Sequence, residues 1–520
     1  MASKGLMCAV ALSVVFTCGC SGDSNEGGGG SGAGSAGAGG DATGGTGAAG
    51  AGGVGGSAGT AGSGAAGAGG SGAGAGGAGG AGGTGGATGG TAGLGGVGGT
   101  AGAAPTSYPW LAVTSGQNLT LVGIEDLTDI KSARLSNSGG FHAWSPDGNA
   151  ILLHDAGKVV VQRVDETGPT ESFTITTANG YYPDTAWSRD GQVVSAVTEN
   201  RELRLLPAYQ DLPTTTVLTY QAIELQWSPT RNEFLLLNGY PSANQLYVGL
   251  PDGSLRQIGE AGAAISEMSW SADGDYVQYR TSSQTRFVVS RDASGTDPGA
   301  SIPASTYFSW IPGGHQFATY GSSPARLFDA ANVGTPTDLS TESASGFGAS
   351  PSGKYFMWRD ATSATLYDTA TQTSSGLAGD PYPSSAVWNH NETRLTYTNA
   401  TGAYLAYLDT SSVESVGLVS PATTVHISPI AQTAFYAVGS SVYLRDVSAN
   451  PPGTSLPVYS TGSQFVTVGA IGWAPRGDRV LYTQKAGSTT TVQALKVEGL
   501  AASAPVQIFD SSGLFDWQPR

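Results

Sequence analysis

One short phrase recurs along this chain: a tryptophan-like residue, a small polar residue, a turn, and then a run of strand-forming residues. Successive copies lie 39 to 46 residues apart, and about 40 to 45 residues is the period of a four-stranded propeller blade. The repeat therefore predicts an all-β, single closed β-propeller. The ten anchor residues are Trp144, Trp187, Trp227, Trp270, Trp310, Ala349, Trp388, Ile427, Trp473 and Trp517.

The interior of each repeat supports four strands per blade. After Trp144 come three short runs at 150–154, 158–164 and 171–175, rich in β-branched residues and bounded by Gly, Asp or Pro, as strands are. The Asp-Gly pair that follows several anchors suits a tight two-residue hairpin, in which both residues have a positive φ. We therefore expect such a hairpin after the anchor.

The spacing of large and small residues around the anchors predicts how the blades pack. The anchor and the residue two places before it are mostly large and apolar, as in Met268 and Trp270, while the alternate positions are small, as in Ser269 and Ser271. Because side chains alternate between the two faces of a strand, the large side chains lie on one face and the small ones on the other, where the large side chains of the next blade fit. We expect the tryptophans to pack between blades and not to form a binding surface.

The two ends of the chain complete each other. Strand-like runs at 110–114 and 119–123 precede the first anchor, and Trp517 is an anchor with no strands after it. Joining them makes a composite blade that closes the ring and removes its exposed edges. This gives ten blades, or as few as eight if the units marked by Ala349 and Ile427 are incomplete.

A family resemblance supports the same fold. The phrase Trp-Ser-Pro-Asp-Gly at 144–148, together with strands of the Leu-Tyr-Val type at 246–248, 366–368 and 442–444, resembles the WD40-like (PD40) repeat of TolB-type β-propellers. Similar repeats occur in the propeller domains of dipeptidyl-peptidase IV and prolyl-oligopeptidase-type enzymes. The resemblance covers about residues 105 to 520 and implies the fold, which hosts many activities.

The N-terminus reads as an export signal. Lys4 precedes an apolar stretch at 7–16, which is too short to span a bilayer. It leads to Thr17-Cys18-Gly19-Cys20, which resembles a bacterial lipobox with Cys20 as the acylated residue. Thr17 departs from the usual aliphatic residue, so secretion without lipid stays open as the alternative. All three cysteines lie in this leader, which excludes disulfides and thiol catalysis from the propeller.

Composition then divides the chain into three parts: a signal peptide at 1–20, a tether at 21–104 and the propeller at 105–520. The tether is almost wholly Gly, Ala, Ser and Thr, a composition that favours disorder. A Gly-rich coil of this length has a root-mean-square span of about 50 Å. We therefore expect a cell-envelope protein attached to a membrane only through its lipid, in the outer membrane or at the cell surface.

The charge of the propeller argues against nucleic acid. The chain carries 39 acidic and 23 basic residues, a net charge of −16, of which only Asp23, Glu26, Asp41 and Lys4 lie before residue 105. Subtraction leaves 36 acids and 22 bases, or −14, for the propeller. A domain this acidic repels nucleic acid and anionic headgroups.

One set of residues is a candidate site. Three places before their anchors, successive repeats carry Asp184, Glu224 and Glu267, and His142 lies two places before Trp144. We expect these side chains at the mouth of the propeller channel, where clustered carboxylates could bind calcium or act as acid and base. The alternative is a solvated acidic rim. The histidines show no metal-ligand spacing, and no cofactor is implied.

Two function classes remain open. The first is a monomeric, non-enzymatic scaffold that binds a protein or glycan partner through one propeller face, as the absence of a catalytic motif favours. A binding face would carry exposed aromatics, such as Tyr181, Tyr182 and Tyr240. The second is a lyase or hydrolase that uses the channel-mouth carboxylates, which would need a deep polar pocket with strongly shifted carboxyl groups.

Overall fold

The structure, a computed structural model, describes residues 110–518 apart from short segments, so the leader, Cys20 and the tether lie outside the described residues. Tyr181, Tyr182 and Tyr240 also lie outside them. Among the described residues, no helix has the length and apolar character needed to cross a membrane. The omitted segments are 116–117, 137–141, 177–183, 199, 212–215, 219–220, 240–243, 261–263, 296, 303–306, 322–323, 361–362, 380–384, 400–401, 411–412, 420–424, 439–440, 461–468, 487–488 and 511–513.

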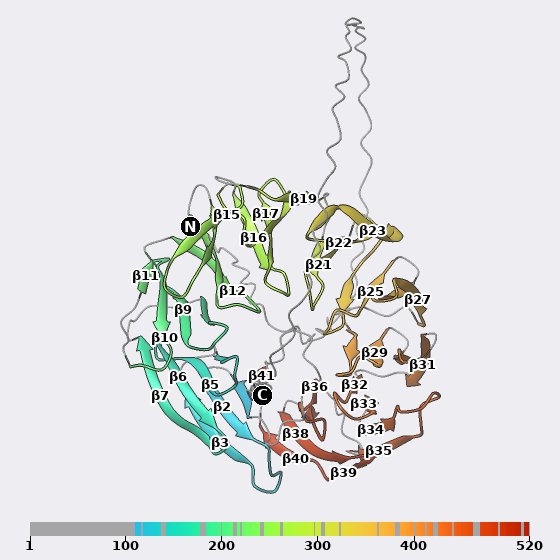
Figure 1. Ribbon diagram of the computed structural model, residues 1–520. Coiled ribbons are helices and arrows are strands. Elements are labelled where there is room, and N and C mark those ends of the chain that lie inside the picture. The colour runs from blue at the N-terminus through green and yellow to red at the C-terminus, as the bar shows by residue number, and fades with distance from the viewer. Residues whose placement is uncertain are drawn as a thin grey trace, which may run out of the picture. The chain divides into compact units, whose positions relative to one another are not determined.

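Ten antiparallel sheets follow one another around a ring (Figure 1), which confirms the predicted all-β propeller. Each sheet begins with the strand that carries an anchor, nearest the centre of the ring. These inner strands are β4 (His142–Trp144), β8 (Asp184–Trp187), β12 (Ala222–Trp227), β16 (Ile265–Trp270), β20 (Tyr307–Trp310), β24 (Phe347–Ala349), β28 (Val387–Trp388), β32 (Val425–Ile427), β36 (Gly469–Trp473) and β41 (Leu514–Trp517). In this order they belong to blades 1 to 10.

The remaining strands complete the blades in the same order. The second strands are β5 (Ala150–Asp155), β9 (Val193–Val197), β13 (Phe234–Asn238), β17 (Tyr276–Thr281), β21 (Gln316–Tyr320), β25 (Tyr355–Arg359), β29 (Arg394–Thr398), β33 (Thr433–Val438), β37 (Arg479–Ala486) and β1 (Leu111–Ser115). The third strands are β6 (Lys158–Asp165), β10 (Leu203–Pro207), β14 (Gln245–Gly249), β18 (Arg286–Ser290), β22 (Pro324–Asp329), β26 (Ala364–Asp368), β30 (Ala403–Tyr407), β34 (Ser441–Asp446), β38 (Thr489–Glu498) and β2 (Asn118–Gly123). The outer strands are β7 (Gly168–Thr176), β11 (Thr216–Leu218), β15 (Leu255–Ile258), β19 (Ala300–Ile302), β23 (Asn332–Ser343), β27 (Thr373–Leu377), β31 (Glu414–Val419), β35 (Ser455–Ser460), β40 (Val506–Phe509) and β3 (Lys131–Ser136), and β39 (Ala501–Ala502) also pairs with β38.

All ten repeats are complete blades. The units marked by Ala349 and Ile427 have four strands each, as do all the others except blade 9, whose sheet has a fifth strand. A tryptophan at the anchor is therefore not required for a blade, because Phe347 and Ile427 place bulk on the same face of their strands.

The hydrophobic core lies between blades and continues through the point of closure. One buried cluster combines Val161 of blade 1 with Trp187 of blade 2. Another combines Leu481 of blade 9 with Val113 of blade 10, and a third combines Leu121 of blade 10 with Ile151 of blade 1. The composite blade thus has a packed neighbour on each side.

The tryptophans hold neighbouring blades together, as predicted. In five of them the indole N–H group crosses to the preceding blade, where it meets a backbone carbonyl or a serine hydroxyl, whereas the indole nitrogen of Trp144 is buried and has no partner among the described residues. The donor–acceptor pairs, each 3.0 Å apart, are Trp187 to Ala143 O, Trp227 to Ser195 Oγ, Trp270 to Gln226 O, Trp310 to Ser269 Oγ and Trp473 to His426 O.

The turn after the anchor is longer than the sequence suggested. Ser145 pairs with Ala150 through a 2.8 Å backbone hydrogen bond, so four residues form the loop, and the predicted two-residue hairpin is wrong. Only Gly148 of the Asp-Gly pair has a positive φ, of 71°. The Ser145 hydroxyl donates to Asp147 (2.6 Å) and accepts the Ala150 amide (2.9 Å), which closes the loop. The same bonds recur at Ser188 and Ser271.

Gln518 closes the ring by imitating this turn. It follows Trp517 as the serine follows other anchors, and its Oε1 accepts the amide of Trp110 at 2.9 Å. Its own amide donates to the carbonyl of Trp110 at 3.0 Å, and its Nε2 donates to the carbonyl of Gly148 in blade 1. Together with the β1–β41 pairing, in which Leu111 lies opposite Trp517, this joins the two ends of the described chain, as predicted.

We expect Gln518→Ala to lower the free energy of unfolding by about 2–4 kcal/mol, because it leaves two buried backbone groups without partners at about 1–3 kcal/mol each. Urea titration followed by tryptophan fluorescence would measure this loss. Gln432→Ala is the control, since Gln432 is exposed on the turn of blade 8. Equal midpoints for the two variants would contradict the role of Gln518 in closure.

Candidate functional site

The structure places the predicted carboxylates on one face of the ring. Asp184, Glu224 and Glu267 lie in β8, β12 and β16, the inner strands of neighbouring blades 2, 3 and 4. We call this side, where the inner strands begin, the entry face, and the side of the loops after the anchors the turn face. β-Bulges precede Glu224 and Glu267 in their strands, and such bulges re-aim side chains.

Only part of this candidate site is described. The side chains of Asp184 and His142 lie outside the described residues, although their backbone is placed in β8 and β4. Among the described residues, no group of three or more His, Cys, Asp or Glu could hold a metal ion. The calcium and acid–base roles of Asp184, Glu224, Glu267 and His142 therefore stay predictions.

Glu267 is held by two arginines of its own blade. Arg286 Nη1 lies 3.0 Å from Glu267 Oε2, and Arg280 pairs with the other carboxylate oxygen. Arg286 is 9% exposed and Glu267 is 41% exposed. Burial lowers the pKa of Arg286, while the negative charge of Glu267 acts in the opposite direction. Any cation at Glu267 would have to compete with these two guanidinium groups.

Tyr307 occupies the same position in blade 5 and is the described exposed aromatic of this face. Its side chain is 53% exposed and stacks on Tyr320 with ring centroids 5.3 Å apart. Tyr320 stacks in turn on Phe347 of blade 6 at 5.4 Å. Tyr307 was not among the predicted site residues, although its place three residues before Trp310 is visible in the sequence.

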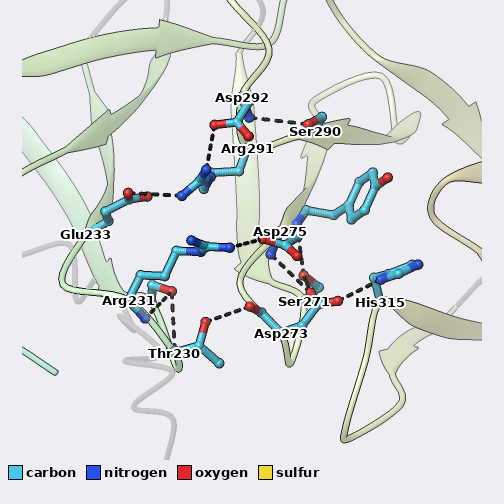
Figure 2. Close-up of polar contacts among 12 residues, drawn as sticks. Thr230, Arg231, Glu233, Ser271, Asp273, Asp275, Ser290, Arg291, Asp292 and His315 are labelled. Carbon is cyan, nitrogen blue, oxygen red and sulfur yellow. Dashed lines mark hydrogen bonds and ion pairs between the residues drawn. The ribbon is translucent and has the colours of Figure 1, made fainter. Parts of the chain in front are cut away.

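The turn face carries a polar seam across blades 3, 4 and 5, shown in Figure 2. Arg231 pairs with Asp275 at 2.5 Å, and Arg291 lies between Glu233 (3.1 Å) and Asp292 (2.7 Å). Each acid thus meets a base of the same or the neighbouring blade. The seam is an inter-blade contact whose charges are already paired.

His315 continues the seam into blade 5. Its Nδ1 lies 2.7 Å from Asp273 of blade 4, and its Nε2 lies 3.4 Å from Asp329. Burial raises the pKa of Asp273, but hydrogen bonds from Ser271 and the Asp275 amide and the contact with His315 outweigh it, so the pKa is lowered. Asp273 is therefore a fixed anion that orients the imidazole ring.

A second contact between neighbouring blades, which we call the clasp, is made by the residue six places after the anchor. This residue contacts the hairpin between the third and outer strands of the next blade, whatever its chemical type. The described pairs are Trp110 with Asp165 O (2.9 Å), Glu233 with Arg291 (3.1 Å), Tyr355 with Leu408 O (3.5 Å), Arg394 with Val447 O (3.2 Å) and Arg479 with Glu125 O (3.1 Å). Trp110 takes this position in the composite blade.

At least seven of the 36 acidic residues of the propeller stabilise its turns. Aspartates at the ends of third strands accept the backbone amides of their own hairpins, as Asp165 does from Thr167 (2.7 Å) and Asp368 from Ala370 (2.8 Å). Such local bonds favour turns. Equivalent contacts occur at Asp126, Asp252, Asp297, Asp329 and Asp446. The repeated turns therefore account for these seven acids without any ligand.

The described surface has several hollows, of which two lie beside blades 5 and 6. One, of about 400 Å³, lies between blades 5 and 6 on the turn face and is lined by His315, Asp329, Lys354 and Thr369. The other, of about 430 Å³, lies between β23 and the strands of blade 6. Asp478 is the carboxyl among the described residues whose pKa is raised, by burial, and it lines neither hollow.

No family model and no curated protein sequence matches the chain. Solved structures that are similar include a eukaryotic initiation factor (14% identity, 80% of this chain and 99% of that one, TM-score 0.49). They also include the dihydro-heme d1 dehydrogenase NirN (12%, 79% and 77%, 0.38) and the C-terminal WD40 domain of Sif2 (15%, 70% and 96%, 0.34). The chain is a ten-bladed β-propeller.

His426 makes the contact between blades 8 and 9 sensitive to acid. Its Nε2 is buried and has no hydrogen-bond partner among the described residues, and burial lowers its pKa from 6.5 to about 4. Below pH 6.5 the unfolded chain takes up a proton at this histidine and the folded chain does not. His426 therefore lowers the free energy of unfolding progressively as the pH falls from 6.5 to about 4.

Between pH 7.5 and 4, we expect the free energy of unfolding of His426→Leu to fall by roughly 3 kcal/mol less than that of the parent, which is the equivalent of the pKa difference. Unfolding free energies at several pH values between 7.5 and 4 would measure it. His390→Gln, an exposed histidine, is the control and should keep the slope of the parent. A His426 variant that retains the parental slope would refute the assignment.

Proposed function

We propose that this protein is a lipid-anchored scaffold of the cell envelope whose propeller binds a protein partner through its entry face. β-Propellers commonly serve as scaffolds for protein interaction. The observation that supports this face is the exposed ring of Tyr307, which stacks on Tyr320 at 5.3 Å. The positive charge of Arg286 in blade 4 acts in turn on Tyr320. Tyr and Arg are the residue types in which the energy of protein interfaces concentrates.

The stacked rings make Tyr307 a preorganised contact. The ladder from Tyr307 through Tyr320 to Phe347 ends on Phe356, which is fully buried. A side chain supported in this way loses little conformational freedom when a partner covers it. A rigid ring that presents such a residue near its centre is suited to binding.

The alternative is an enzyme that uses Asp184, Glu224, Glu267 and His142. Such a site would need Glu267 to be available for proton transfer or for a cation. Its pairing with Arg280 and Arg286 favours the binding role instead. A glycan in place of a protein remains the other partner that a stacked tyrosine would suit.

The envelope location is part of the proposal. The lipobox-like sequence at 17–20 and the Gly-rich tether at 21–104 support export and acylation at Cys20, and the resemblance to TolB-type repeats is consistent with such a compartment. A tether of about 50 Å would keep the propeller near a membrane without pressing it against the surface.

We expect Tyr307→Ala to reduce partner capture by the full-length protein at least tenfold, because it removes the exposed ring and leaves the buried rings in place. Cross-linking on intact cells followed by quantitative mass spectrometry would measure capture. Ile430→Ala is a matched control, since Ile430 is 55% exposed on the turn face. Loss of capture by the Ile430 variant alone would move the contact to the other face and contradict the proposal.

We expect Cys20→Ser to shift the protein from the membrane fraction to the soluble fraction, because the lipid would be its only anchor. Fractionation with immunoblotting, and mass spectrometry of the N-terminal peptide, would show the change. Cys18→Ser is the control and should remain in the membrane fraction. A Cys20 variant that stays with the membrane would show that another signal anchors it.

A further inference from the structure

We propose that Arg280 and Arg286, beside Glu267, bind a carboxylate from an acidic side chain of the protein partner. This site lies at the entry face between blades 4 and 5 and rests on the binding function proposed above. It names the chemistry that the partner must present there.

The charges of this cluster do not balance. Two guanidinium groups share a single carboxylate, each taking one oxygen of Glu267. Tyr320 is the other titratable group that acts on Arg286. The cluster therefore carries a net positive charge, although the chain as a whole carries −16. Such a local excess is the electrostatic condition for attracting one anion.

The hydrogen bonds are also unbalanced. A guanidinium offers five N–H donors, and the Nε atoms of both Arg280 and Arg286 are buried without a partner among the described residues. Glu267 has already given one oxygen to each arginine. Because these Nε atoms are buried, a second carboxylate would accept hydrogen bonds from the partly exposed guanidinium of Arg280 (24%), and the Nε–H groups would report the change in charge beside them.

The cluster is accessible from one side and shielded on the other. Arg286 is 9% exposed and its guanidinium lies 5.8 Å from the ring of Phe308 in blade 5. Arg280 is 24% exposed and Glu267 is 41% exposed, so the solvent side is formed by these two residues. Partial burial strengthens a charge-assisted contact relative to one in open water.

The neighbouring aromatic residues favour a protein as the bearer of the carboxylate. Blade 5 separates Phe308, which contacts Arg286, from Tyr307, which faces blade 6. An arginine pair and an exposed tyrosine on neighbouring blades of the same face match the composition of protein hot spots. A partner that covers Tyr307 would bring neighbouring side chains to the arginine pair.

The test uses the full-length protein with ¹⁵N-labelled arginine and two capped tripeptides, acetyl-Ala-Glu-Ala-amide and its Gln counterpart. NMR of the arginine Nε–H groups reports binding at the site. We expect a saturable shift of the Arg280 and Arg286 signals with the Glu peptide and none with the Gln peptide. Equal responses to the two peptides would overturn the proposal.

Three variants separate binding from a merely structural role. Arg280→Gln should abolish the shift, whereas Arg326→Gln, which removes an exposed arginine of blade 5 paired with Asp338 at 2.8 Å, should leave it unchanged. Glu267→Gln should increase the affinity for the Glu peptide at least fivefold, because it removes the competing carboxylate. A purely structural ion pair predicts no gain, so an unchanged or weaker affinity would refute the site.

Two further outcomes distinguish this inference from the proposed function. If the Glu peptide does not bind while Tyr307→Ala still abolishes partner capture, the carboxylate site is wrong and the binding function stands. If glucuronate binds through Arg280 more than tenfold tighter than the peptide, the bearer is an acidic glycan and the protein assignment is overturned. If neither Tyr307→Ala nor Arg280→Gln alters partner capture, both proposals fail.

Discussion

The contact between neighbouring blades is the constraint on which the rest of this structure depends. A four-stranded sheet of this kind has two apolar faces and cannot bury either of them alone, so every blade needs a neighbour on each side. The anchor tryptophans meet this need with an apolar ring and an N–H group that crosses to the preceding blade, as at Trp187 and Trp270. Burial of the ring supplies most of the stabilisation, since a single hydrogen bond contributes only about 1 kcal/mol.

The clasp six places after the anchor explains why charge is a poor guide to function in this chain. Arg394 and Arg479 donate to backbone carbonyls of the next blade. Asp165 and Asp368 accept amides of their own turns. The Arg280–Arg286 pair differs from these, because two guanidinium groups share the single carboxylate of Glu267.

The sequence specified the architecture because the repeated residues are those that pack between blades. The period follows from the spacing of the anchors. The facing of Met268 and Trp270 follows from the alternation of side chains within one strand. The pairing of the chain ends follows from the strands that the last repeat lacks and the first residues of the propeller supply. The length of the turn was not predictable from the Asp-Gly pair, because the loop is closed by the Ser145 hydroxyl. The clasp was also hidden, because Trp110, Glu233 and Arg394 fill it with different chemistry.

The candidate site required the register of the sheet. Glu267 looked like one of three similar carboxylates, but the bulge before it sets Glu267 opposite Arg280 in β17, and a bulge is not visible in the sequence. Tyr307 is at the same position one blade further on, where it presents an aromatic ring instead of a charge. The residue three places before the anchor is thus not required for cohesion, and it varies from blade to blade on a rigid frame. Because this equivalent position carries a different residue in different blades, the entry face of the ring is chemically different from one blade to the next. A single partner can recognise such a surface.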